Sequence, residues 1–290
     1  MSKKGIVLIG PGRVGQAITR LLWEAGHEIR AIISRDPARA LAAARFIGVP
    51  GAATTDLSRA GEGEIVLIAL PDDRIAEIAS QLRREGHLRA GTILVHFSGL
   101  HPASILLGEE GPALGALSIH PLQPLADAVM GVRNLPGSPF AVEGAEELLP
   151  LGERLVKEIG GVPFRISGPQ KPLYHAAACI ASNYMVALTA AAGQVLAACG
   201  LDEVASSRML APLVRSTVKN LVALGPEIAL TGPISRGDVR TVAKHLKALA
   251  ELSPELTTIY KVMGRKTVEV ARNKGTLEEE DAAKILALLE

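Results

Sequence analysis

The sequence predicts an α/β fold, with a doubly wound, mostly parallel β-sheet followed by an all-helical domain. Three observations lead to this prediction. Short apolar runs alternate with helical stretches through the first half of the chain, a glycine-rich turn follows the first apolar run, and only helical patterns follow residue 167. Continuously apolar strands separated by helices are typical of a parallel sheet that is covered on both faces.

The candidate strands are short runs rich in Val, Ile, Leu and Phe. They are expected at Gly5–Gly10, Glu28–Ser34, Glu64–Leu70, Thr92–Phe97, Leu114–Ile119, Phe140–Glu143 and Pro163–Ile166. Helices between the early strands are expected at Val14–Ala25, Pro37–Ile47 and Ile75–Glu85. This alternation predicts the parallel sheet.

The chain changes character at Ser167-Gly168-Pro169, so we expect one domain over residues 1–167 and a second over residues 168–290. The second domain shows helical periodicity only. Its helices are expected at Pro172–Cys199, Asp202–Leu224, Gly237–Leu249, Pro254–Arg272 and Glu278–Leu289, with Gly200, Gly225 and Pro226 as breaks.

The first of these helices is apolar and rich in alanine. Residues 176–199 are long enough to span a membrane, but the stretch contains polar side chains, namely Ser182, Asn183, Thr189 and Gln194. A buried or dimer-forming helix is therefore favoured, and no membrane contact is expected. Because small alanine side chains let a second helix approach and shorter neighbours cannot cover so long a helix, we expect a homodimer built on the C-terminal helices.

The overall composition favours a small-molecule ligand. The chain has 290 residues, 48% of them hydrophobic, and a formal net charge of +1, so a sizeable core is expected and nucleic acid is not an expected partner. The seven histidines lack metal-ligand spacing, and no metal site is expected. Cys179 and Cys199 form no CxxC pair, and no signal peptide precedes the first strand, so a cytoplasmic protein is expected.

A glycine-rich loop, Gly10-Pro-Gly12-Arg-Val-Gly15, lies between the first predicted strand and helix. In a GxGxxG loop the first glycine permits a tight turn, the second lets the backbone approach a pyrophosphate, and the third lets the helix pack on the strand. The helix N-terminus then offers free N–H groups to the phosphates. The loop predicts dinucleotide binding by Gly10, Gly12, Arg13, Val14 and Gly15.

The end of the second strand indicates which dinucleotide binds. A site for NAD places Asp or Glu there, about 20 residues past the last glycine, to bind the ribose hydroxyls. Ser34 and Arg35 occupy this position, and Asp36 is expected to start the next helix with Pro37. A hydroxyl and a guanidinium favour a 2′-phosphate, which a carboxylate would repel, so NADP(H) is the expected cofactor. The alternative for Arg35 is an ordinary surface charge.

Several sequence runs together resemble one family. They are Ala69-Leu-Pro-Asp-Asp73, Val95-His-Phe-Ser-Gly99, Ser118-Ile-His-Pro-Leu-Gln123, Leu173-Tyr-His-Ala-Ala-Ala178, Ala181-Ser-Asn-Tyr184 and Ala229-Leu-Thr-Gly-Pro-Ile-Ser-Arg-Gly-Asp238. Through them the chain resembles candidate NADP oxidoreductases that join a Rossmann-like domain to a helical C-terminal domain of unknown function. The resemblance extends over nearly the whole chain and implies a Rossmann-type sheet and an NADP(H) cofactor, but no particular substrate.

Two more distant resemblances concern parts of the chain. The layout is similar to the β-hydroxyacid dehydrogenase and ketopantoate reductase group, in which a helix with Lys-x-x-x-Asn follows the Rossmann domain. Lys171 matches that lysine, but His175 stands where asparagine is expected, and this departs from the hydroxyacid enzymes. The N-terminal domain, with Ser34 and Arg35, is also similar to deazaflavin-dependent NADP reductases.

Loops after the predicted strands supply further candidate residues, because ligands of open parallel sheets bind beyond the carboxyl ends of the strands. The candidates are Leu70 and Pro71 for the cofactor, and Ser98, His120 and Gln123 for the substrate. Ser98 could instead shape a turn, and His120 could be a hydrogen-bonded structural histidine. Asp72 or Asp73 is expected to cap the next helix.

The helix after the domain boundary carries a polar stripe. At about 100° per residue, Lys171, His175 and Ser182 lie within about 60° of one another on an otherwise apolar helix. A buried ammonium without a task costs several kcal/mol, so Lys171 or His175 is expected to supply a proton in catalysis. Asn183 is a further catalytic candidate. The alternative is a solvated lysine and a core histidine.

The loop from Gly232 to Asp238 precedes another predicted helix. Ser235 or Asp238 can cap that helix, and Arg236 at its positive end favours an anion. Arg236 is therefore a candidate substrate contact that could complete the cleft of a dimer partner. The alternative is a simple capping loop.

The sequence thus predicts an NADP(H)-dependent oxidoreductase that transfers a hydride to or from a small carbonyl or imine substrate. A deazaflavin-dependent NADP reductase is an alternative enzyme. A non-catalytic NADP-binding sensor or scaffold is the alternative from another class, and it would bind NADPH without turnover.

Overall fold

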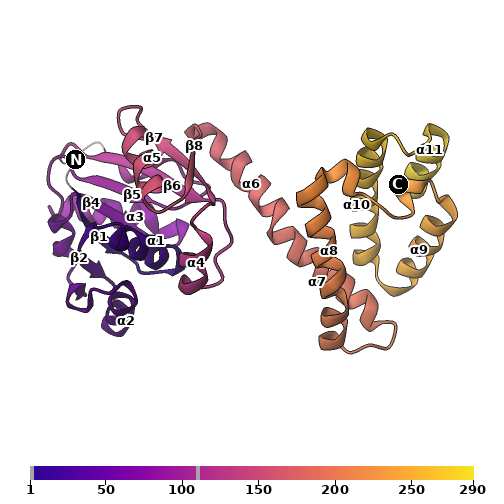
Figure 1. The fold of residues 1–290 in the computed structure, drawn as a ribbon, viewed down its shortest axis with the longest axis horizontal. Coiled ribbons are helices and arrows are strands. Elements are labelled where there is room, and N and C mark those ends of the chain that lie inside the picture. The colour runs from indigo at the N-terminus through magenta and orange to yellow at the C-terminus, as the bar shows by residue number, and fades with distance from the viewer. Residues whose placement is uncertain (1–2, 109–111) are drawn as a thin grey trace. The chain divides into compact units, whose positions relative to one another are not determined.

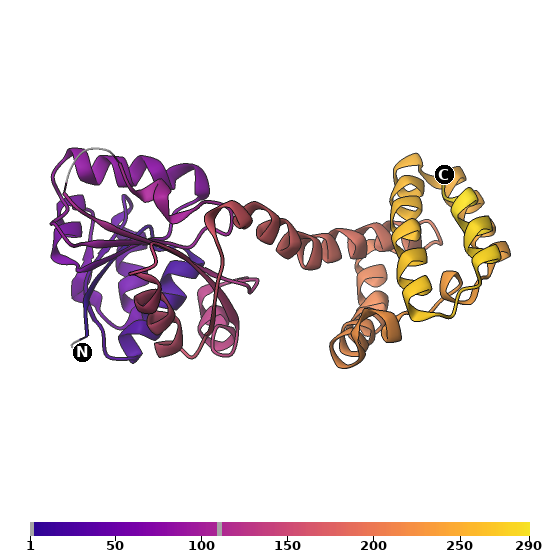
Figure 2. The same ribbon diagram turned by 90° about the horizontal axis from the view of Figure 1, so that it is seen from above.

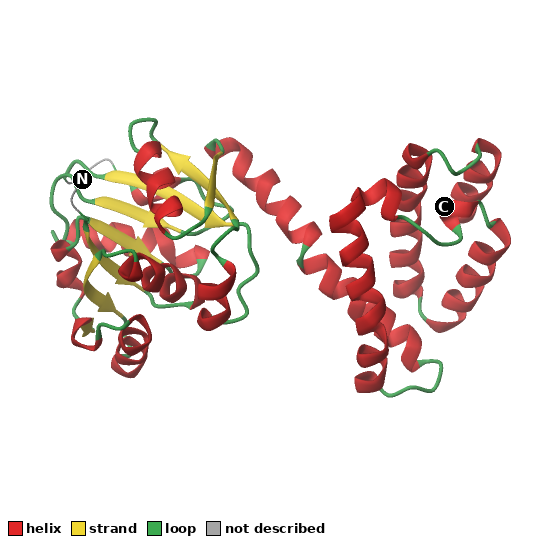
Figure 3. Cartoon of the chain, viewed as in Figure 1, coloured by secondary structure: helices red, strands yellow, loops and turns green. Residues whose placement is uncertain are grey.

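The structure, a computed structural model, describes residues 3–108 and 112–290. By its internal contacts the chain divides into two compact units, Met1–Ser182 and Asn183–Glu290. The last strand of the sheet ends at Arg165, close to the expected domain boundary, but the helix that follows is grouped with the sheet. Among the described residues, strands occur only in the first unit (Figure 3).

The first unit is built on one eight-stranded sheet (Figure 1). The strands are β1 (Gly5–Ile9), β2 (Glu28–Ile33), β3 (Ala53–Thr54), β4 (Ile65–Ile68), β5 (Ile93–His96), β6 (Gly115–Pro121), β7 (Pro139–Gly144) and β8 (Val162–Arg165). Their order is β3-β2-β1-β4-β5-β6-β7-β8, and only the β6–β7 pair is antiparallel. The predicted doubly wound sheet is confirmed; the short strand β3 was not expected. The strand order reverses between β1 and β4, which is where such sheets bind ligands.

Helices cover both faces of this sheet, and short 3₁₀ turns connect some of the elements. The helices that precede the last strand are α1 (Arg13–Glu24), α2 (Pro37–Ile47), α3 (Asp72–Arg84), α4 (Ala128–Asn134) and α5 (Leu149–Glu158), and α6 (Lys171–Ala181) follows the sheet without covering a face. The 3₁₀ turns are η1 (Pro50–Ala52), η2 (Leu57–Glu62), η3 (Ala103–Leu106) and η4 (Gly168–Gln170). Helices α4 and α5 were not predicted.

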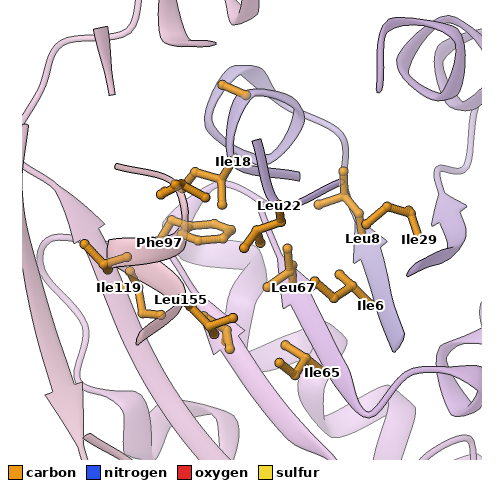
Figure 4. Packing of buried hydrophobic residues seen from close by; sticks show 14 of the residues in the cluster. Ile6, Leu8, Ile18, Leu22, Ile29, Ile65, Leu67, Phe97, Ile119 and Leu155 are labelled. Atoms are coloured by element: carbon orange, nitrogen blue, oxygen red, sulfur yellow. The ribbon is translucent and has the colours of Figure 1, made fainter. Parts of the chain in front are cut away.

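Two cores follow from the alternation of side chains along the strands. Ile6 and Leu8 of β1 point to the face covered by α1, where Ile18 and Leu22 pack on them (Figure 4). Val7 and Ile9 point to the opposite face, which α3 covers. Figure 2 shows these helices on opposite sides of the sheet. Both faces of each central strand are buried, so the strands have no polar alternation.

N-terminal caps were predicted for two helices of this unit, α2 and α3. Asp36 caps α2 as expected, since its carboxylate accepts hydrogen bonds from the N–H groups of Ala38 and Arg39. At α3 the expected cap is wrong, because Pro71 occupies the N-cap position. Asp72 and Asp73 instead lie in the first turn, where a carboxylate is stabilised by the positive end of the helix dipole.

The second unit consists of helices. They are α7 (Asn183–Ala197), α8 (Glu203–Ala229), α9 (Val239–Leu252), α10 (Pro254–Lys274) and α11 (Glu279–Leu288), with the 3₁₀ turn η5 (Ile234–Arg236). Val242, Val268 and Ile285 are fully buried at the centre of its core. Within α8, Gly225 has a φ of 77°, so the helix is broken there, as the Gly225-Pro226 pair predicted.

The long alanine-rich helix expected at Pro172–Cys199 is interrupted. Ser182 has φ −115° and ψ −65° and separates α6 from α7, so one uninterrupted helix is wrong. By length and composition alone, Gly168–Ala197 is the one helical stretch of the described residues that is long and apolar enough to cross a membrane. Its apolar window has no buried residue.

Candidate active site

The glycine loop has the geometry of a phosphate-binding turn. Gly10 follows β1 with a φ of 74°, and a Cβ on it would lie 2.3 Å from a methyl of Leu70. The loop therefore packs closely on the end of β4. Gly12 is the N-cap of α1 and has no side chain to occupy the first N–H groups of that helix. These N–H groups and the open backbone suit a pyrophosphate.

A cavity of about 330 Å³, here called the switch-point cavity, opens beside this loop. It is lined by the loop and by the carboxyl ends of β4, β5 and β6, that is, by Gly12, Arg13, Val14, Gly15, Ala69, Leu70, Asp72, Phe97, Ser98, His120, Pro121, Gln123 and Leu125. Eight predicted site residues meet here, namely Gly12, Arg13, Val14, Gly15, Leu70, Ser98, His120 and Gln123. Gly10 shapes the turn beneath them, and Pro71 lies outside the lining.

Ser34 and Arg35 follow β2 directly. Arg35 is exposed, and its guanidinium has no hydrogen-bond or ion-pair partner within residues 3–108 and 112–290. The hydroxyl of Ser34 accepts the N–H of Asp36, whose own carboxylate is engaged in capping α2. The carboxylate of Asp36 is thus engaged in capping α2, while the guanidinium of Arg35 stays available for an anionic ligand.

Lys171 is the first residue of α6 and is completely buried. Its Nζ donates to the carbonyl oxygen of Ser98 at 2.9 Å and to the hydroxyl of Ser118 at 2.7 Å. The alternative of a solvated lysine is therefore wrong. Burial lowers the pKa of Lys171 to about 8, although the charges of Glu143 and Asp72 act in the opposite direction. Since Ser98 lines the switch-point cavity, Lys171 lies one residue behind its wall.

His120, at the end of β6, is paired with a tyrosine that sequence reasoning missed. Its Nδ1 lies 2.7 Å from the hydroxyl of Tyr174, and the two rings meet edge to face at 5.4 Å. Burial, with the nearby charges of Lys171 and His175, lowers the pKa of His120 to about 4, so the ring is neutral at neutral pH. Burial raises the pKa of Tyr174 to about 12. The i, i+3 spacing of Tyr174 from Lys171 was the signal for a shared helix face.

His175 lies next to this pair. Its ring is perpendicular to that of His120, with centroids 5.8 Å apart. Its Nε2 lies 3.8 Å from the sulfur of Cys179, whereas its Nδ1 is buried without a hydrogen-bond partner among the described residues. A Cβ at Gly99 would lie 2.5 Å from this Nδ1 and 2.9 Å from Nε2 of His120. Only glycine leaves room for both imidazoles.

A second residue that sequence reasoning missed, His96, supports the loop after β5. His96 is fully buried, and burial lowers its pKa to about 3, so it is neutral. Its Nδ1 accepts the N–H of Ser98, which leaves Nε2 to donate to the carbonyl of Pro102 at 3.2 Å. The Ser98 hydroxyl accepts the N–H groups of Leu100 and His101, as a turn residue does, while Ser98 also lines the cavity.

The remaining predicted site residues are Ser182, Asn183 and Arg236. Ser182 is half-buried and lies at the end of α6. Asn183 and Arg236 belong to the second unit, and both are exposed. Asp238, one of the two residues proposed to cap α9, does so by accepting the N–H of Thr241.

No group of three or more metal-ligating side chains occurs in the part of the chain that the structure describes. The cluster instead contains the ammonium of Lys171, the imidazoles of His96, His120 and His175 and the phenol of Tyr174. These groups donate, accept and transfer protons, so the site suits acid–base chemistry beside a bound dinucleotide.

Comparison with known families places both parts of the chain. Residues 2–121 match the model of a Rossmann-like domain, and residues 138–267 match the model of a domain of unknown function, DUF2520. The chain pairs a Rossmann-like domain with a DUF2520 domain. No curated protein matches it in sequence.

Solved structures share this two-part fold. A protein from Thermotoga maritima is 27% identical, with a TM-score of 0.73 over 93% of this chain and 99% of that one. A candidate NADP oxidoreductase from Bacteroides fragilis is 24% identical, with a TM-score of 0.74 over 92% and 98%. An NAD-binding semialdehyde dehydrogenase from Cupriavidus necator, solved with calcium and NAD, is 18% identical, with a TM-score of 0.61 over 94% and 99%. The Rossmann-like and DUF2520 pair thus has the fold of NAD(P)-dependent oxidoreductases.

Proposed function

We propose that this protein is an NADP(H)-dependent oxidoreductase that transfers a hydride to or from a small carbonyl or imine substrate. The observation that carries the proposal is the buried ammonium of Lys171, which lies behind the wall of the switch-point cavity and donates to two uncharged oxygens. Burying a charge in this way costs several kcal/mol. A strongly perturbed titratable group beside a ligand cavity is typical of an active site.

The residues around the cavity fit an NADP(H) cofactor, which would supply the hydride when bound. The N–H groups at the start of α1 would hold the pyrophosphate, because Gly12 leaves them free and the helix dipole is positive there. Arg35 and Ser34 would hold the 2′-phosphate. The preference for NADP(H) rests on Arg35 and on the engagement of Asp36 in the cap of α2.

Reduction of a carbonyl or imine leaves a basic atom that must gain a proton. Lys171 uses two of its N–H groups on Ser98 and Ser118, so a third is left for proton transfer. Its pKa of about 8 lets it give and regain a proton near neutral pH. His175, with a buried Nδ1 that lacks a partner among the described residues, is the second candidate.

The test is turnover. We would mix the protein with NADPH and a panel of 2-oxo acids, aldehydes and cyclic imines and follow the absorbance of the reduced nicotinamide. We expect Lys171→Met or His175→Ala to lower turnover by about 10²–10⁴-fold while NADPH affinity is unchanged. Lys157→Met, at an exposed position of α5, is the matched control and should behave as wild type.

Two outcomes would contradict this proposal. Binding of NADPH without turnover on the whole panel would favour a non-catalytic NADP sensor. Normal turnover in both variants would show that α6 serves packing and not proton transfer.

We further propose that the protein is a homodimer formed by its helical unit. Large apolar side chains are exposed on α7 and α8, among them Val186 at 69%, Leu213 at 63% and Val222 at 82%. Large apolar side chains that are exposed in such number often meet a partner. We expect the dimer in the cytoplasm, where the free thiols of Cys179 and Cys199 stay reduced.

A further inference from the structure

Tyr174, the partner of His120 at the end of β6, packs between two aromatic rings. Phe164 of β8 packs edge to face on Tyr174 with ring centroids 6.0 Å apart, and Tyr174 packs in the same manner on His120. The 2.7 Å contact between Nδ1 and the phenol oxygen has the ordinary length of a hydrogen bond. His120 is therefore fixed in orientation, with Nδ1 toward Tyr174.

Both members of this hydrogen bond are uncharged, so its direction depends on the tautomer of His120. Tyr174 keeps its proton, because its pKa is raised, and His120 is a neutral imidazole with one N–H. No other acceptor for the phenol proton occurs among the described residues. A phenol that donates to Nδ1 leaves the single imidazole proton on Nε2.

The Nε2 atom of His120 has no hydrogen-bond partner among the described residues. His120 lines the switch-point cavity, and its Nε2 lies over Gly99, where a Cβ would approach it to 2.9 Å. The buried Nδ1 of His175 lies over the same Cα. Gly99 has no positive φ, so the backbone does not require glycine there. Glycine is required at this position because the two imidazoles occupy the space that a side chain would need.

We propose that Tyr174 is a positioning residue that holds His120 as a neutral Nε2–H donor, and that this donor, by binding the carbonyl oxygen, selects a carbonyl compound as the substrate whose carbon accepts the hydride. The proposal rests on the proposed function and narrows its substrate class. The evidence for the donor is the geometry of Tyr174, His120 and Gly99, which is independent of turnover.

The selection follows from the chemistry of the two candidate substrates. When a carbonyl carbon gains a hydride, the π-electron pair of the C=O bond moves to oxygen, which becomes an alkoxide and then takes a proton. A fixed N–H donor stabilises this developing negative charge. An iminium, the form of an imine that accepts hydride readily, has no lone pair for the donor and carries a positive charge. The nearby ammonium of Lys171 repels that charge and favours the alkoxide.

The first test reads the tautomer directly. Protein labelled with ¹⁵N-histidine would be studied by ¹H–¹⁵N NMR in the presence of NADPH, and the His120 signals would be identified by their loss in His120→Ala. We expect an unprotonated Nδ1 and a protonated Nε2 in the wild type. In Tyr174→Phe we expect this preference to be lost, because the ring remains but the donor does not.

The helical unit provides a matched control. His245 and Tyr260 form a second pair of the same kind, with Nδ1 2.9 Å from the phenol oxygen and ring centroids 5.8 Å apart. Tyr260→Phe removes an equivalent hydroxyl and should leave the His120 signals unchanged. Thermal unfolding of both variants would show whether either loss of a hydroxyl disturbs the fold.

The second test is the substrate panel. We expect carbonyl compounds to be reduced faster than 1-pyrroline, and we expect Tyr174→Phe to slow carbonyl reduction about tenfold. His120→Ala should slow it by about 10²–10³-fold, the usual effect of losing one donor to a developing oxyanion.

The outcomes separate the two proposals. A proton on Nδ1 of wild-type His120, or a tautomer unchanged by Tyr174→Phe, would overturn the role of Tyr174. Turnover of imines alone, insensitive to Tyr174→Phe, would overturn the substrate class. Absence of turnover on the whole panel would overturn the proposed function and the substrate class with it, whereas the NMR result would still decide the role of Tyr174.

Discussion

Lys171→Met tests the cost of the buried ammonium through the pH dependence of stability. The pKa of Lys171 is about 8 in the folded chain, against an ordinary value of 10.5. Between these values the unfolded chain binds more protons than the folded chain, so the free energy of unfolding rises with pH. The buried charge of Lys171 therefore destabilises the fold by its full amount below about pH 8, and this destabilisation disappears above pH 10.5.

The size of the effect follows from the same two values. At about 1.4 kcal/mol per pH unit, the ammonium destabilises the fold by about 3 kcal/mol below pH 8. Methionine removes this charge, but Ser98 and Ser118 then lose a donor, which costs about 1–3 kcal/mol at any pH. The two effects nearly cancel at pH 7. The free energy of unfolding of wild type, minus that of Lys171→Met, should therefore increase by about 3 kcal/mol as the pH rises from 7 to above 10.

The assay is urea unfolding at a series of pH values from 7 to above 10. Trp23 is the single tryptophan, and it packs against the core between the sheet and α1, so its fluorescence reports on the unit that holds Lys171. Lys157→Met, at an exposed position, should give a difference from wild type that does not vary with pH. A constant difference for Lys171→Met as well would refute the buried-ammonium argument.

Three further predictions concern cofactor, site and assembly. Arg35→Ala should weaken NADPH binding about ten- to a hundredfold and leave NADH binding unchanged, as measured by fluorescence titration with Arg45→Ala as the control; equal wild-type affinities for the two cofactors would contradict it. Gly99→Ala should lower stability by about 1–3 kcal/mol in thermal unfolding, because its Cβ would lie 2.5 Å from His175 Nδ1; an unchanged melting temperature would show that the imidazoles have room to move. Val222→Glu should shift a dimer toward the 30.3 kDa monomer in light scattering, and a wild-type monomer at micromolar concentration would reject the dimer.

Much of the fold was predictable because the signals are local. The strand β1, the loop to Gly15 and the helix α2 follow from apolar runs, glycine spacing and the Asp36-Pro37 start. Two of the missed elements, β3 and α4, are short, with 2 and 7 residues, whereas the missed helix α5 is amphipathic and its periodicity was visible in the sequence. Ser182 shows a further limit: nothing in the sequence around it marks the break between α6 and α7.

The candidate site divides in the same way. The sequence by itself determined the cofactor loop, the absence of an acid at Ser34-Arg35 and the polar stripe with Lys171 and His175, because each depends on spacing within one element. Only the tertiary structure decided that Lys171 is buried against Ser98 and Ser118 and that Tyr174 bonds to His120. Those contacts join α6 to the ends of β5 and β6, more than 50 residues apart in sequence. Burial and charge there depend on how the elements pack, which no local pattern encodes.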